Sequence, residues 1–133
     1  MTFKRFYSRN RGQSLVETAI VLPILLLLIM GIIDFGLLFN NYILISNAAR
    51  EGARKAALGG DDSEITQTIH NMTTTLKLSN MDIEISPSQS NRGHGTQVKV
   101  KLSYKHELIT PVIEKLFPEN SININAATVM RVE

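Results

Sequence analysis

Two carboxylates are notable for their apolar surroundings. Glu17 lies near the start of RGQSLVETAIVLPILLLLIM, residues 11–30, and Asp34 follows the apolar run. Ionisable groups are rare in membrane segments, where they commonly form specific pairs. Glu17 could form such a pair or extend to the lipid–water interface. Asp34 could mark the other end of a membrane span or form a buried helix–helix contact.

The three histidines do not form a local metal-binding motif. His70, His94 and His106 are widely scattered, and we expect them to be ordinary surface or loop residues. Ser14 has no histidine near it in sequence, and the chain contains no cysteine for a thiolate ligand or nucleophile. We therefore predict no enzymatic activity, metal, cofactor or small-molecule substrate.

A group of acids beyond residue 60 could suggest calcium binding. Asp61, Asp62 and Glu64 lack the alternating ligand positions of a calcium loop. Acids are favourable at the positive end of a helix, and aspartate is a common N-cap. We therefore predict that these residues begin a helix.

The positive charge of the chain is concentrated at its start. Four of the fourteen basic residues lie within the first twelve positions, and the remainder has ten basic against twelve acidic residues. This distribution gives little support for nucleic-acid binding. A positive segment before an apolar run is typical of exported or membrane-inserted chains. The four residues are Lys4, Arg5, Arg9 and Arg11.

The apolar run from Ala19 to Ile33 is predicted to cross a membrane. It contains eleven Leu, Ile or Val residues, which favour insertion by about 3–7 kcal/mol. From Glu17 to Asp34 a helix rises about 26 Å, close to the ~30 Å hydrocarbon thickness. The basic flank predicts a cytoplasmic N-terminus. A cleaved secretory signal would normally have its small-residue cut site after the run, but the chain stays apolar and helical past Asp34, so we expect the apolar segment to be retained.

The pattern predicts that one helix continues from Leu15 to Leu58, bent or loosened at Pro23 and stopped by Gly59-Gly60. Small residues recur at spacing four near its end and would allow another backbone to approach closely. The possible helix–helix contact residues here are Ala49, Gly52 and Ala53, on two stripes that also include Ala48, Ala56 and Ala57.

The rest of the chain reads as a small α+β domain. The pattern of residues 61–78 predicts a second helix, with acids at its start. Its apolar face would be formed by Ile65, Ile69, Met72 and Leu76. Period-two alternation predicts strands at 81–85, 96–104 and 121–132 in an antiparallel sheet. In the second strand, the residues expected to face the helix are Val98, Val100, Leu102 and Tyr104. Residues 108–120 would form a longer excursion closed by Pro118.

The start of the chain resembles a known signal. A basic leader, Gly12, and a glutamate five residues later at the head of an apolar helix resemble the class III signal of type IV pilin-like proteins. The continuation, residues 11–57, resembles the TadE-like domain of tight adherence (Flp) pilus assembly proteins. The ending, residues 110–133, is similar to the tail of that family.

The resemblance implies a minor pilin or pseudopilin that takes part in pilus assembly. A prepilin peptidase would cut after Gly12, leaving Gln13 as the new N-terminus, and Glu17 would contact other pilin subunits or the assembly platform. The main pilins of this system have an aromatic residue after the glutamate, where this chain has Thr18, which argues for an accessory subunit. The alternative is an uncleaved, signal-anchored envelope protein with an external binding domain.

These expectations divide the chain into three parts. Residues 1–12 form a basic leader, 13–58 a transmembrane and extended pilin-like helix, and 59–133 a small exported α+β domain. The protein would cross the cytoplasmic membrane once, with its N-terminus inside and its C-terminal domain outside, and could be incorporated in a surface pilus.

Overall fold

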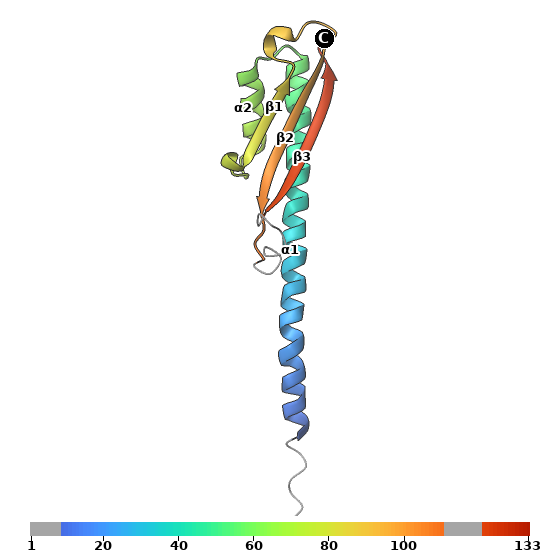
Figure 1. Cartoon of the computed structure of the whole chain (residues 1–133), viewed down its shortest axis with the longest axis vertical. Coiled ribbons are helices and arrows are strands. Elements are labelled where there is room, and N and C mark those ends of the chain that lie inside the picture. Colours follow the sequence, from blue (N-terminus) through green and yellow to red (C-terminus); the bar gives the residue numbers. More distant parts are fainter. Residues whose placement is uncertain (1–8, 111–120) are drawn as a thin grey trace, which may run out of the picture.

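The computed structural model describes residues 9–110 and 121–133, and a single long helix dominates its shape (Figure 1). This helix, α1, spans Arg9–Ala57 and continues unbroken through Pro23. Its N-terminal half stands clear of the other labelled elements, whereas its C-terminal half packs against the remaining fold (Figure 1). The predicted continuous helix is confirmed, although it starts before Leu15. Most of the predicted leader lies outside the described residues.

Helix α1 ends where the double glycine was expected to stop it. Gly59 has a φ of 85°, a left-handed conformation that glycine adopts without steric penalty. The Gly59 N–H donates to the carbonyl of Ala56 at 3.1 Å, and the Gly60 N–H donates to that of Lys55 at 3.0 Å. These two bonds form a Schellman motif that satisfies carbonyls of the last helical turn.

The second helix, α2, spans Asp62–Met72 and is shorter than predicted. Asp61 is its N-cap and accepts a hydrogen bond from the Glu64 N–H at 2.7 Å, which confirms the helix-start interpretation of the acids. The predicted continuation to residue 78 is wrong: the helix ends at Met72, with Thr73 as its C-cap at the start of a Thr-rich stretch, and threonine has a low helix propensity. Met72 is 36% exposed, while Leu76 is buried beyond the end of the helix.

Three antiparallel strands form the sheet in the order β1-β2-β3, as the alternating pattern predicted. They span Met81–Ser86 (β1), Gln97–Glu107 (β2) and Ser121–Arg131 (β3). Short 3₁₀ turns, Leu78–Asn80 (η1) and Gln89–Asn91 (η2), lie on either side of β1. β2 extends to Glu107, beyond its predicted end. The predicted loop closure at Pro118 lies outside the described residues.

One face of the sheet supplies the core. On β2, the buried side chains are Val98, Val100, Leu102, Tyr104 and His106, while the alternate positions are partly or fully exposed. The four apolar positions face inward as predicted. This alternation places one row of side chains against α1, because strand residues point to opposite faces in turn.

Small residues on α1 allow the other elements to approach it closely. Ile45 and four alanines of α1 are buried in one cluster with α2 and the sheet: Ala48, Ala49, Ala53 and Ala56. A Cβ atom placed on Gly52 would lie 2.9 Å from Cδ1 of Ile69. The α+β fold class is therefore confirmed, with the second half of α1 forming part of its core.

Polar contacts fix the connections around this core. The buried Arg92 guanidinium pairs with Asp62 at the start of α2, and its Nε donates to the carbonyl of Pro87 at 2.9 Å. At the other end of the sheet, Lys77 Nζ lies 2.7 Å from Glu107 Oε2. These contacts hold the segments on either side of β1 against α2 and β2.

A side chain at Gly52 should destabilise the domain. Gly52→Leu would force Ile69 and its neighbours to shift, and overpacking of this kind typically costs about 1–3 kcal/mol. Gly36→Leu is the matched control, because nothing lies within 4 Å of a Cβ atom at Gly36. We expect thermal unfolding of the full chain in detergent, followed by circular dichroism, to shift downward for Gly52→Leu only. Equal stability of the two variants would contradict the packing described here.

Candidate functional site

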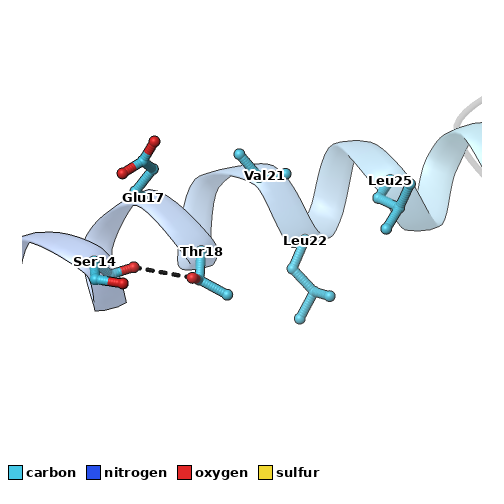
Figure 2. A pocket seen from close by; sticks show the side chains of 6 residues that line it. All are labelled: Ser14, Glu17, Thr18, Val21, Leu22 and Leu25. Atoms are coloured by element: carbon cyan, nitrogen blue, oxygen red, sulfur yellow. Dashed lines mark hydrogen bonds between the residues drawn. The ribbon is translucent and has the colours of Figure 1, made fainter.

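Glu17 lies on the exposed surface of the free half of α1. Together with five neighbours it lines a shallow depression on the helix surface (Figure 2): Ser14, Thr18, Val21, Leu22 and Leu25. Figure 2 shows Glu17 and Val21 projecting from one side of the helix and Leu22 from another. All six residues come from one helix, so this depression is an open surface that a second molecule would have to cover.

The polar groups near Glu17 in the described part of the chain do not bind its carboxylate. The Thr18 hydroxyl donates to the Ser14 carbonyl of its own helix at 2.9 Å and does not turn toward the acid (Figure 2). Among the described residues, no hydrogen bond or ion pair involves Glu17. Its two oxygens can therefore accept bonds from an external cation or N–H group.

The predicted cleavage site, Gly12 and Gln13, lies within α1 near its start. Both residues are exposed, and nothing lies within 4 Å of a Cβ atom at Gly12. A peptidase would therefore meet no side-chain obstruction at Gly12. The Gln13 backbone is one helical turn from Glu17, because 3.6 residues complete a turn.

The helix surface that follows Glu17 is apolar and uncovered. Every large apolar side chain from Leu15 to Ile33 is at least 40% exposed. The most apolar 18-residue window has a mean hydropathy of 2.7, and only 6% of it is buried within the chain. Exposing so large an apolar surface to water would be very unfavourable. Among the described residues there is one helix, α1, that is both long enough and apolar enough to cross a membrane.

Asp34 is placed differently from Glu17, because the chain itself covers it. The side chain is only 4% exposed. Its Oδ1 accepts a hydrogen bond from the Ile109 N–H at 3.1 Å, and its Oδ2 accepts one from the Thr110 N–H at 3.0 Å. The carboxylate therefore joins α1 to the segment that follows β2, far along the sequence.

His106 is buried on β2, which corrects the expectation of a surface or loop histidine. Its Nδ1 lies 3.0 Å from Asn41 Nδ2 on α1, while its Nε2 is buried without a hydrogen-bond partner. Burial lowers the pKa of His106, and the negative charges of Asp34 and Glu107 partly oppose this effect. The histidine is therefore biased toward its neutral form. Extending the β2 alternation by two residues would have identified it as inward-facing.

The predicted small-residue contact on α1 is occupied within the chain. Ala49 and Ala53 are fully buried, and Gly52 lies against Ile65 and Ile69 of α2. This packing brings α1 and α2 together. It leaves these three residues covered and unable to meet a second molecule without rearrangement of the domain.

The described residues do not gather metal ligands. No group of three or more His, Cys, Asp or Glu side chains among them could hold a metal ion. Asp61 instead accepts hydrogen bonds from the Glu64 N–H and the Ser63 hydroxyl, both at 2.7 Å, and these bonds lower the pKa of its carboxyl group. The acids therefore act at the start of α2.

In the described part of the chain, one helix is able to cross a membrane, and its C-terminal half packs against a small α+β domain. Glu17 lies on the uncovered half of this helix, and Asp34 lies where the domain begins. Residues 12–54 match the family model of TadE-like proteins, which confirms the predicted resemblance over about a third of the chain. The match lies within α1. Searches of curated proteins and of solved structures found no match.

Removing the Asp34 carboxylate should loosen the junction between α1 and the sheet. Asp34→Ala would leave two backbone N–H groups without their acceptor, and for the buried bond to Thr110 the typical cost is about 1–3 kcal/mol. We expect faster hydrogen exchange at the Ile109 and Thr110 amides in the full chain. Asp82→Ala, at an exposed position of β1, should leave both amides protected. Unchanged exchange in Asp34→Ala would show that these bonds do not hold the segment.

Proposed function

We propose that this protein is an accessory pilin-like subunit that takes part in the assembly of a tight adherence pilus. The observation that carries the proposal is an exposed carboxylate, Glu17, on an apolar helix that matches the TadE-like family. An unpaired acid near a membrane boundary is unfavourable, so its retention on such a surface fits a role in pairing with another molecule.

The attachment is proposed to depend on processing of the leader. A prepilin peptidase on the cytoplasmic face would cut between Gly12 and Gln13 and create a free amine at Gln13. The amine of one subunit can pair with the Glu17 carboxylate of a neighbouring pilin or pseudopilin, since opposite charges attract strongly where water is scarce. This pairing would align an incoming subunit on the assembly platform.

The exported domain is proposed to remain outside the cytoplasmic membrane. The four basic residues before the apolar run favour a cytoplasmic N-terminus, because positive charge is retained on that side. The free apolar half of α1 would then span the bilayer, and the α+β domain beyond Asp34 would lie on the outer side. Such a protein could remain in the membrane or enter the pilus with the other subunits.

The orientation can be tested with a reporter that is active only after export. Fused after Glu133, the reporter should be active, because Glu133 lies at the end of the exported domain. The matched control is the same reporter fused at the N-terminus, which should be inactive. The opposite pair of results would reverse the orientation and contradict the proposed attachment.

A neutral residue at position 17 should separate assembly from membrane insertion. Glu17→Val removes the carboxylate and makes the helix more apolar, so membrane retention should persist or increase. We expect normal removal of the leader but loss of surface pili in a strain that carries the peptidase and the other pilus proteins. The measurements are the mature mass, the membrane fraction and the number of pili on one strain.

Gly12→Leu provides the contrasting variant, because it changes the cleavage site and leaves Glu17 in place. It should accumulate as a full-length precursor. An unprocessed wild-type chain in the same strain would favour the uncleaved, signal-anchored alternative. Normal piliation by a cleaved, membrane-held Glu17→Val protein would show that Glu17 only extends to the interface.

A further inference from the structure

An aromatic stripe follows the apolar run on α1. Phe35, Phe39 and Tyr42 are exposed, and Phe35 is 66% exposed. The ring centroids of Phe35 and Phe39 are 6.1 Å apart, and those of Phe39 and Tyr42 are 6.4 Å apart. At about 100° per residue these three positions fall on one face of the helix. The stripe is therefore continuous and lies outside the core of the domain.

The distance from Glu17 to the aromatic stripe along the axis of α1 follows from the helical rise. With a rise of about 1.5 Å per residue, Phe35 is about 27 Å, Phe39 about 33 Å and Tyr42 about 38 Å along the helix from Glu17. If Glu17 marks the inner edge of a hydrocarbon layer about 30 Å thick, the stripe spans its outer edge. This is the depth at which aromatic side chains are enriched in membrane proteins.

The order of the side chains follows the change in polarity at that edge. The two phenylalanines come first, and the tyrosine, which has a polar hydroxyl group, comes last. After Asp34, which the chain itself covers, the next charged residue on α1 is Arg50. The exposed face of α1 between Asp34 and Arg50 therefore has no charged side chain that would have to be desolvated in the membrane interface.

A segment distant in sequence also reaches the base of the domain. Ile109 follows β2 and is 65% exposed, although it is a large apolar residue. Its N–H donates to Asp34 Oδ1 at 3.1 Å, and Asp34 directly precedes Phe35 on α1, so the Ile109 backbone is held near the start of the stripe. A residue distant in sequence thus adds exposed apolar surface close to the depth at which the aromatic stripe begins.

We propose that Phe35, Phe39, Tyr42 and Ile109 form an interfacial surface that rests in the headgroup layer of the outer leaflet of a phospholipid bilayer. The surface is continuous with the apolar span, which favours lipid over a second protein as its occupant. The Asp34 bonds fix the domain at this depth, with its base in the interface and its far end in water. This inference rests on the membrane span and is independent of the proposed role in pilus assembly.

The absence of tryptophan from the chain permits a direct measurement of depth. Single tryptophans would be introduced into the full chain as Leu28→Trp in the span, Phe39→Trp in the stripe and Ile109→Trp after β2. Val129→Trp is the control, because Val129 is exposed and lies two residues before the end of β3. The C-terminal end of β3 is remote from the free half of α1 (Figure 1). Each protein would be placed in phosphatidylcholine vesicles with brominated acyl chains.

We expect most of the emission to be lost for Leu28→Trp, part of it for Phe39→Trp and Ile109→Trp, and none for Val129→Trp. Bromine near the headgroup end of the acyl chain should quench the Phe39→Trp and Ile109→Trp proteins more than bromine near the chain terminus. The reverse dependence on bromine depth should hold for Leu28→Trp. Circular dichroism would verify that each variant is folded, with Phe35→Trp replacing any Phe39→Trp protein that is not.

Quenching of Leu28→Trp without quenching of the Phe39→Trp and Ile109→Trp proteins would overturn the proposal. So would emission at Phe39→Trp that depends on protein density in the vesicles, because a second copy would then cover the stripe. The vesicles contain no pilus proteins, so failure here leaves the proposed assembly role standing, and loss of piliation in Glu17→Val leaves the interfacial surface standing.

Discussion

The paired hydrogen bonds of the Asp34 carboxylate determine where this protein changes from a bare helix to a folded domain. Before Asp34, the apolar side chains of α1 are exposed. After Asp34, α1 contributes buried side chains to the core from Ile45 onward. The bonds to the Ile109 and Thr110 N–H groups bring the end of β2 to this point. Because a buried carboxylate is stable only when its acceptors are satisfied, the junction constrains both the helix and the sheet.

The same helix meets two different packing requirements. Its first half has large aliphatic residues on all sides, which suits a lipid environment. Its second half has small residues on one face, which allow Ile65 and Ile69 of α2 to approach its backbone. Since α1 is continuous, a subunit attached through Glu17 would have its domain held at a fixed distance along the helix from that contact.

Glu17 and Asp34 show how the surroundings of a carboxylate on α1 determine its role. Asp34 is satisfied within the chain, so it contributes to the position of the domain. Glu17 has no partner among the described residues and remains open to an external one. The buried His106 of β2 adds a polar contact to α1 through Asn41. The polar contacts of Asp34 and Asn41 therefore lie at the base of the domain, and the unpaired Glu17 lies at the opposite end of the span.

The sequence alone determined the long helix, its glycine stop, the helix cap at Asp61 and the inward face of β2, because each depends on local periodicity or backbone geometry. It also placed Glu17 on an apolar helix. Only the tertiary structure decided that Asp34 binds the Ile109 and Thr110 backbone, that Gly52 is covered by α2 and that His106 is buried. These contacts join residues far apart in the chain, and no local pattern specifies which distant groups will meet.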